Sequence, residues 1–325
     1  MNKIKEFAII GLGKMGSSLA LQAQEKGFNV IGYDVQKKIR EQLSEKGIHT
    51  INSIDELNTI NGIKVIFLYV PAGKIVDKVI HDLKPILSSG DIIIDAGNSY
   101  WGDSIRRAEE LKNEGIILMD TGTSGGIRGA RNGACFMTGG DKKTYQQLAH
   151  IYEELSVSDG AIYTGPSGSG HFVKLVHNGI EFGMLQAIGE GMSLLDKFHE
   201  KLDVPEVLKC WSNGSVIRSW LIELMREQYV EQNGSTNTNS YIEDTGEVNW
   251  LVNDAMKMDV PVPVISQSVM ELMRSRDKNK TDHKSVSLMR HGFGEHPFGP
   301  LEGIRKERET GKVGKFPESL YYDND

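Results

Sequence analysis

The stretch Glu6–Gly16 reads EFAIIGLGKMG and runs from apolar residues straight into a glycine turn. Gly11, Gly13 and Gly16 have the spacing G-x-G-x-x-G, and a helix-like pattern follows at residues 17–26. In that context the motif indicates a dinucleotide site rather than a sheet with an ordinary glycine turn. Gly11 permits the tight turn, Gly13 lets a pyrophosphate approach the backbone, and Gly16 allows the helix to pack closely on the strand.

The acidic residue that such a site requires is Asp34, which ends a second predicted strand at residues 29–33. A carboxylate there accepts hydrogen bonds from both hydroxyls of the adenosine ribose, and it repels the additional phosphate of NADP. No Arg follows it directly, and Lys37 and Lys38 are the nearest cations. The sequence therefore favours NAD, while NADP stays open.

Strand-like and helix-like stretches alternate through the first half of the chain. Further strands are expected at residues 65–70, 92–95 and 116–120, with helices at 36–46, 74–87 and 103–113. This alternation predicts a parallel sheet that helices cover on both faces. Residues 134–137 and 161–163 are expected to add edge strands.

The pattern changes at Gly165–Gly168, beyond which strand signals fade and helical periodicity begins. Helices are expected at residues 171–198, 205–212, 219–227, 250–256, 264–274 and 281–289. We therefore predict an α/β, Rossmann-like NAD-binding domain over residues 1–166. An all-α domain for substrate binding and dimerisation would follow over residues 167–325. The role of the charged stretch 301–325 stays open.

The composition is that of an ordinary soluble protein, with 39% hydrophobic and 25% charged residues among 325. The net charge of −7 argues against general binding to nucleic acid or to acidic membranes. Two cysteines cannot form a disulfide framework, and no apolar run approaches the length of a membrane span. We therefore expect a cytoplasmic protein that has neither nucleic acid nor membrane as a partner.

A polar stripe falls on the first long helix of the second predicted domain. Lys174, His177, Asn178 and Glu181 stand at positions i, i+3, i+4 and i+7, which share one helix face. The residues between them are mostly apolar, so the helix is expected to be buried apart from this stripe. Such a stripe usually lines a site, and the alternative is a solvated face of little consequence. A metal site is less expected because lysine is not a usual ligand.

This helix resembles the catalytic helix of the 6-phosphogluconate dehydrogenases. Residues 90–99, GDIIIDAGNS, resemble the family's strand and turn that place an Asn beside nicotinamide and substrate. Residues 122–126, GTSGG, resemble its loop for the substrate carboxylate. Residues 290–296, RHGFGEH, are similar to a tail that reaches the neighbouring subunit's site. The resemblance runs from about residue 6 to residue 297, and the chain length matches the shorter branch, which often uses NAD.

The resemblance implies oxidative decarboxylation of 6-phosphogluconate to ribulose 5-phosphate and CO2, with Lys174 as the base, Glu181 as the acid and no metal. The cofactor residues would be Gly11, Gly13, Met15, Gly16, Asp34, Val70, Ala72 and Asn98. The substrate residues would be Asn98, Ser124, Gly125, Gly126, His177, Asn178, Arg290 and His296. The last two would come from a second subunit, so the resemblance implies a homodimer or a higher homo-oligomer.

Two departures from the family pattern leave the substrate open. Phe182 stands where many relatives have a Tyr that contacts the phosphate, and Asn249 stands where many have a Lys or Arg. Arg274 and Arg276 are candidates to compensate, and a sugar acid without phosphate stays possible. Another alternative is a β-hydroxyacid dehydrogenase that oxidises a different small hydroxy acid without decarboxylation. A NAD-binding sensor without catalysis is disfavoured because the lysine and glutamate of the catalytic helix are both present.

Overall fold

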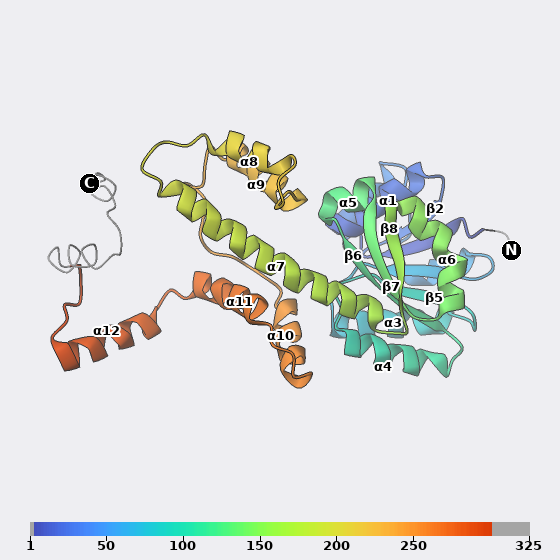
Figure 1. Ribbon diagram of the computed structural model, residues 1–325. Helices are drawn as coiled ribbons and strands as arrows, with labels where there is room; N and C mark the ends of the chain where they lie inside the picture. Colours follow the sequence, from blue (N-terminus) through green and yellow to red (C-terminus); the bar gives the residue numbers. More distant parts are fainter. Residues whose placement is uncertain (1–2, 301–325) are drawn as a thin grey trace. The chain divides into compact units, whose positions relative to one another are not determined.

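The computed structural model describes residues 3–300, and its first part is an eight-stranded sheet (Figure 1). The strands are β1 (Glu6–Ile10), β2 (Asn29–Tyr33), β3 (His49–Thr50), β4 (Val65–Leu68), β5 (Ile92–Asp95), β6 (Ile117–Ser124), β7 (Ala134–Gly139) and β8 (Ser156–Gly165). They lie in the order β3-β2-β1-β4-β5-β6-β7-β8. All neighbours are parallel except β6 and β7. The order of the first six strands is that of a doubly wound dinucleotide-binding fold, which confirms the predicted α/β class.

Helices cover both faces of this sheet because its strands are apolar on both sides. The helices are α1 (Lys14–Glu25), α2 (Lys37–Ser44), α3 (Lys74–Leu83), α4 (Trp101–Lys112), α5 (Gly126–Asn132) and α6 (Lys142–Leu155), with 3-10 helices η1 (Ile54–Thr59) and η2 (Lys84–Ile86). Phe7 and Ile9 belong to a core cluster with residues of α1 and α6, whereas Ala8 and Ile10 belong to a second cluster with α3 and α4. Alternation along a strand thus gives the sheet two cores.

Two features of this part differ from the expectation. Helix α6 was missed, although Asp141 caps its N-terminus by accepting a hydrogen bond from the Thr144 amide at 2.8 Å. Leu148, Ile151 and Leu155 form its buried stripe at i, i+3 and i+7. In addition, β7 is not an edge strand, because β8 pairs with it in parallel, from Ala134 opposite Ser156 to Gly139 opposite Gly165, and forms the edge itself.

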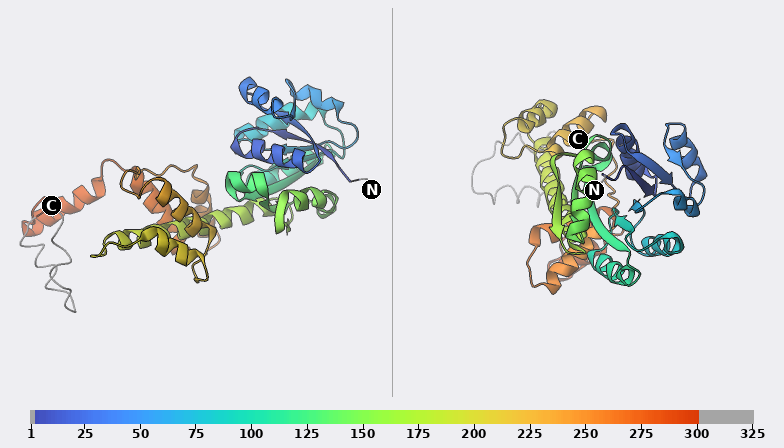
Figure 2. Two further views of the ribbon diagram at one scale, coloured as in Figure 1. Left: turned by 90° about the horizontal axis from the view of Figure 1, so that it is seen from above. Right: turned by 90° about the vertical axis from the view of Figure 1, so that its right-hand side faces the viewer.

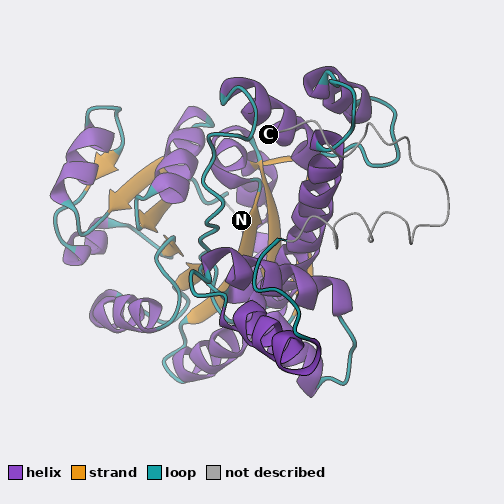
Figure 3. Cartoon of the chain, turned by 90° about the vertical axis from the view of Figure 1, so that its left-hand side faces the viewer, coloured by secondary structure: helices purple, strands orange, loops and turns teal. Residues whose placement is uncertain are grey.

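The rest of the described chain is helical, as predicted. Its helices are α7 (Ser169–Asp196), α8 (Val204–Ser212), α9 (Trp220–Glu231), α10 (Glu247–Lys257), α11 (Pro263–Arg276) and α12 (Thr281–Gly294). Helix α7 is one unbroken helix (Figure 2), and no strand follows β8 up to residue 300 (Figure 3). Across residues 3–300, no helix combines the length and the apolar character that a bilayer span requires.

The described chain forms two compact units that do not coincide with a division at residue 166. The first contains the residues up to Gly179 together with Gly246–Val260, and the second contains Ile180–Thr245 and the described residues from Pro261 onward. The beginning of α7 is bonded to β6 and α10 contacts the start of α4, which agrees with this division. The domain ranges 1–166 and 167–325 stay a prediction, and the stretch 301–325 lies outside the described residues.

Candidate active site

The turn between β1 and α1 has the form that a bound pyrophosphate requires. Gly11 has a φ of +91°, and a Cβ at this position would lie 2.4 Å from the carbonyl oxygen of Tyr69. A Cβ at Gly16 would lie 2.0 Å from the carbonyl oxygen of Gly11. At Gly13, by contrast, a Cβ would meet no atom within 4 Å. The turn is therefore closed on its protein side and open over Gly13, which fits a dinucleotide phosphate. Met15, in the same turn, is half-buried.

Asp34 is buried at the end of β2 and is held beside this turn by two backbone amides. Its Oδ2 accepts a hydrogen bond from the Leu12 amide, and its Oδ1 accepts one from the Gln36 amide, both at 2.8 Å. The carboxylate therefore lies at the end of β2, where dinucleotide-binding folds have the acidic residue that binds the adenosine ribose. Sequence reasoning missed Arg40, whose Nη1 donates to the Asp34 carbonyl oxygen at 2.7 Å. Only the fold reveals this contact, because it depends on where α2 lies relative to the end of β2.

The residues expected beside nicotinamide lie on two neighbouring turns. Val70 and Ala72 follow β4 and are half-buried, and Asn98 follows β5 and is exposed. Because β4 and β5 are paired in parallel, their carboxyl ends lie side by side. The turns touch at Gly97, where a Cβ would lie 2.8 Å from the Val70 carbonyl oxygen.

Four polar side chains from α7 and β6 form one hydrogen-bonded cluster. The Lys174 Nζ donates to the Asn178 Oδ1 at 2.6 Å and lies 3.4 Å from the His177 Nδ1. His177 Nδ1 is 3.1 Å from the same Asn178 oxygen, and its Nε2 is 3.0 Å from the Ser124 Oγ. With Nδ1 as a donor to the amide oxygen, Nε2 of the neutral ring is left to accept the Ser124 hydroxyl proton. We call this set the Lys174 cluster.

The loop next to this cluster is built from two glycines in left-handed conformations. Gly125 and Gly126 follow Ser124 with φ values of +106° and +58°. A Cβ at Gly126 would meet no atom within 4 Å. The loop is thus open to a ligand immediately beside the Ser124 hydroxyl.

The sheet holds the beginning of α7 through a residue that the sequence analysis did not single out. Asp120 of β6 is buried, and its two carboxylate oxygens accept hydrogen bonds from the amides of Gly168 at 2.7 Å and His171 at 2.9 Å. Gly122, two residues further along β6, allows close packing, because a Cβ there would lie 2.3 Å from the Cβ of Lys174. An acidic residue inside an apolar strand was the available signal, but its partner amides are about 50 residues away in the chain.

Two other titratable side chains border this region. Burial raises the pKa of the Cys135 thiol, while the charge of Lys174 lowers it in part. Cys135 pairs with Ser124 in the antiparallel ladder of β6 and β7. Burial also raises the pKa of Tyr69 to about 12, although its hydrogen bond with Thr123 acts in the opposite direction. Tyr69 therefore stays a neutral phenol at ordinary pH and does not serve as a base.

The remaining predicted residues belong to the second compact unit. Glu181 is seven residues beyond Lys174 on α7, and helical periodicity places positions i and i+7 on one side of a helix. Arg290 and His296 are brought together at the end of α12, with 3.5 Å between Arg290 Nη2 and His296 Nδ1. Arg276, a candidate to replace missing cations, is paired with the carboxylate of Asp244.

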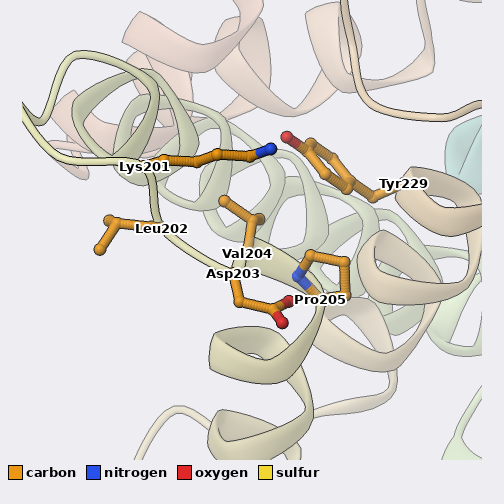
Figure 4. Close-up of a pocket in the computed structure, with 6 residues that line it drawn as sticks. All are labelled: Lys201, Leu202, Asp203, Val204, Pro205 and Tyr229. Carbon is orange, nitrogen blue, oxygen red and sulfur yellow. The ribbon is translucent and has the colours of Figure 1, made fainter.

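Two cavities occur in the second unit, but neither contains a predicted site residue. They have volumes of about 440 and about 590 Å³ and lie where α7 ends and α8 begins. Figure 4 shows the residues that line the first of them. Lys201, Leu202, Val204 and Tyr229 line both cavities. Within residues 3–300 no three His, Cys, Asp or Glu side chains gather as metal ligands do. The candidate site therefore consists of the glycine turn, the two nicotinamide-side turns and the Lys174 cluster.

A doubly wound sheet with an open glycine turn, followed by helices that carry a buried lysine, defines a dehydrogenase that uses a nicotinamide dinucleotide. The comparison with protein families specifies which one. The NAD-binding domain of 6-phosphogluconate dehydrogenase matches residues 6–165, and the C-terminal domain of the same enzyme matches residues 170–296. The chain belongs to the 6-phosphogluconate dehydrogenase family.

Individual relatives agree with this assignment. The chain is 38% identical over 292 residues to YqeC of Bacillus subtilis, whose name places it provisionally among these enzymes, with coverage of 90% of this chain and 98% of that protein. It is 36% identical over 294 residues to a 6-phosphogluconate dehydrogenase of Haloferax volcanii, named NAD(+)-dependent and decarboxylating, with coverage of 90% and 97%. Among solved structures, the Plasmodium falciparum enzyme, described with NADP+ and with 6-phosphogluconate, has a TM-score of 0.77 at 27% identity, covering 93% of this chain and 68% of that one.

Proposed function

We propose that this protein oxidises and decarboxylates 6-phosphogluconate to ribulose 5-phosphate and CO2, with NAD as the hydride acceptor. The observation that carries the proposal is the Lys174 cluster, in which an amine, an amide, an imidazole and a hydroxyl are linked by hydrogen bonds beside an open glycine loop. Membership of the family supplies the reaction, and the cluster supplies groups that suit it.

The chemistry needs a base that later returns its proton. Bound NAD supplies the acceptor for the hydride that leaves C3 of the substrate. Lys174, as a neutral amine, accepts the proton of the C3 hydroxyl, so that a 3-keto acid results. The C1–C2 bond then breaks, CO2 leaves, and the electron pair moves toward the C3 oxygen. The Lys174 ammonium returns its proton to that oxygen and yields an enediol.

The enediol becomes the product ketose when C1 receives a proton and the hydroxyl on C2 loses one, which the neutral amine of Lys174 accepts. Glu181, two turns beyond Lys174 on α7, is our proposed donor of this proton to C1 of the product. A carboxylic acid and an amine on one side of a helix thus divide the acid and base steps between them. Asn98, Ser124, His177 and Asn178 would orient the sugar acid, and the amides of Gly125 and Gly126 would bind its carboxylate.

Two contacts at the end of β2 support the choice of NAD. The Asp34 carboxylate is fixed by the amides of Leu12 and Gln36, so it cannot swing away from a 2′-phosphate that it would repel. The nearby Arg40 already donates to the Asp34 carbonyl oxygen and to Asn52 Oδ1, at 2.7 and 3.3 Å. Its Nη1 and Nη2 are therefore already used as donors within the protein.

We further propose that the protein acts in the cytoplasm as a homodimer or a higher homo-oligomer. Val286, Met289 and Phe293 are exposed on α12 at spacings that share one face of the helix. Arg290 lies among them in the sequence, and with His296 it would complete the phosphate site of a neighbouring copy. Cytoplasmic location agrees with the two free cysteines of the described chain.

An assay of the purified full-length protein tests the proposal directly. 6-Phosphogluconate, gluconate and 3-hydroxyisobutyrate are each offered with NAD and, separately, with NADP, while reduced cofactor and released CO2 are both followed. We expect equal amounts of reduced cofactor and CO2 from 6-phosphogluconate, with NAD the preferred acceptor. Activity on gluconate alone would indicate that Phe182 and Asn249 mark the loss of a phosphate site. Oxidation of 3-hydroxyisobutyrate without CO2 release would overturn the proposal.

A further inference from the structure

One buried arginine contacts both turns that are expected to flank nicotinamide. Arg107 lies on α4 and is 1% exposed. Its Nη2 donates to the carbonyl oxygen of Gly73 at 3.0 Å, its Nε to Asp77 Oδ1 at 2.7 Å, and its Nη1 to Asp95 Oδ2 at 3.4 Å. A single guanidinium therefore links the beginning of α3 and the end of β5 to α4.

Two of these acceptors mark the limits of the nicotinamide-side turns. Gly73 ends the turn after β4, which carries Val70 and Ala72. Asp95 ends β5 and begins the turn that carries Asn98, and it accepts a hydrogen bond from the Gly97 amide through its other oxygen at 3.3 Å. Arg107 thus joins one turn to the other through directional hydrogen bonds.

The guanidinium group of Arg107 is better suited to fixing the positions of the two turns than to stabilising the fold. A buried ion pair offers little net stability over an apolar replacement of similar volume, because both charges must be desolvated. The planar fork of arginine, however, fixes several acceptors in defined directions at once, which an ammonium group cannot do. Asp95 is fully buried, and the pKa of Asp77 is lowered chiefly by its hydrogen bond from Arg107. Asp77 therefore stays ionised and helps to seat the fork.

We propose that Arg107 is a positioning residue that sets the spacing of the two nicotinamide-side turns, and through it the rate of hydride transfer. It touches neither cofactor nor substrate in this role. The inference rests on the proposed function, because it assumes that Val70, Ala72 and Asn98 contact the nicotinamide end of the dinucleotide.

The neighbouring residue provides a matched control. Arg106 shares Asp77 with Arg107, at 2.8 Å, but it is largely exposed and its other carboxylate partners are Glu110 and Asp103 on its own helix. The variants Arg107→Lys and Arg106→Lys both keep a positive charge on α4. Only the first removes a fork that reaches Gly73 and Asp95.

The experiment compares turnover with the binding of two ligands in the full-length protein. Kinetics with 6-phosphogluconate give kcat and KM, and calorimetry gives Kd for NAD and for ADP-ribose, which lacks the nicotinamide ring. In Arg107→Lys we expect kcat to fall about tenfold to a hundredfold, as misplacement of reacting groups by about 1 Å produces. The Kd for NAD should rise while the Kd for ADP-ribose stays unchanged. Arg106→Lys should keep the wild-type kcat and the wild-type ratio of the two Kd values.

The results that would overturn the role of Arg107 differ from the results that would overturn the proposed function. A lower Tm in Arg107→Lys with unchanged kcat and Kd ratio would show a merely structural role and overturn the inference, as would an equal loss in Arg106→Lys. If Arg107→Lys does not fold, Asp77→Ala takes its place, because Asp77 is only half-buried and its removal takes away the carboxylate that seats the guanidinium. An unchanged Kd ratio in that variant would also overturn the inference. If wild-type protein does not oxidise 6-phosphogluconate, the proposed function fails, and the ratio of Kd values still decides the role of Arg107.

Discussion

The two compact units bury their apolar residues to very different extents. In the first unit, clusters on the two faces of the sheet enclose side chains such as Phe67 and Leu68, which are almost fully buried. In the described part of the second, a small cluster contains the buried residues Val204, Leu208 and Ile222, with partly buried neighbours. Helix α12 has no buried residue at all among those described.

The difference indicates what each unit requires for stability. A sheet with helices on both faces closes two cores within one chain. The helical unit instead leaves large apolar side chains in water: Leu194, Val216 and Phe293 are at least 74% exposed. Exposed apolar surface of this extent is typical of an interface with another protein. The comparison supports a first unit that can bind dinucleotide by itself and a second unit that depends on another copy of the chain.

The largest expected effect is a loss of turnover without a loss of NAD affinity, from a substitution within the first unit. In Lys174→Ala we expect turnover to fall by about 10²- to 10⁴-fold, because the amine that accepts and returns the proton is lost. Affinity for NAD should be preserved, because the glycine turn and Asp34 belong to other segments. Steady-state kinetics and NAD titration measure the two properties. Turnover at the wild-type rate would refute Lys174 as the base.

A smaller loss of activity is expected from a substitution in the second unit that leaves the first unit intact. Phe293→Glu places a charge on the exposed apolar face of α12 and should weaken self-association by about 2 kcal/mol or more, as changes at central interface residues do. Activity should fall with the loss of Arg290 and His296 from the neighbouring site, while NAD affinity is retained. Sedimentation at several protein concentrations and parallel assays provide the measurement.

The control for that change is on the same helix. Lys284→Glu alters the charge at an exposed position whose side chain points away from the face of Val286, Met289 and Phe293. It should leave both assembly and activity unchanged. If Phe293→Glu has the same mass and activity as wild type, then α12 is not an interface and the comparison between the units needs another explanation.

The smallest effect concerns a helix that comes late in the chain but belongs to the first unit. Asp254 of α10 is buried and accepts hydrogen bonds from Tyr100 Oη at 3.0 Å and Trp101 Nε1 at 2.8 Å. Asp254→Ala leaves both donors without this acceptor and should lower the free energy of unfolding by about 2 kcal/mol. Asp254→Asn, which keeps an acceptor oxygen, should lose less.

Urea unfolding followed by tryptophan fluorescence measures this effect, because Trp101 and Trp250 both report on the surroundings of α10. A midpoint in Asp254→Ala equal to that of wild type would show that α10 is not an integral part of the first unit. The boundary between the two units would then follow the order of the chain, and α10 would belong with the helices that precede and follow it in the sequence.

Much of the fold was predictable because its signals are local. The glycine spacing from Gly11 to Gly16 and the apolar strands indicated a doubly wound sheet, and helical periodicity placed α7 to α12 within a few residues. The spacing of Lys174, His177 and Asn178 predicted a shared face, and the structure joins these side chains through hydrogen bonds. Helix α6 was missed although its cap and apolar stripe were present.

What the sequence by itself determined is the class of fold, the dinucleotide turn and the composition of the catalytic helix, since each follows from residues within a few turns or one strand of one another. Tertiary structure alone decided the supports of the site: Asp120 holds the start of α7, Arg107 joins two turns, and Arg40 approaches Asp34. These contacts connect separate elements, and no local spacing encodes them. Their physical cause is the parallel sheet, which gathers the carboxyl ends of distant strands at one edge.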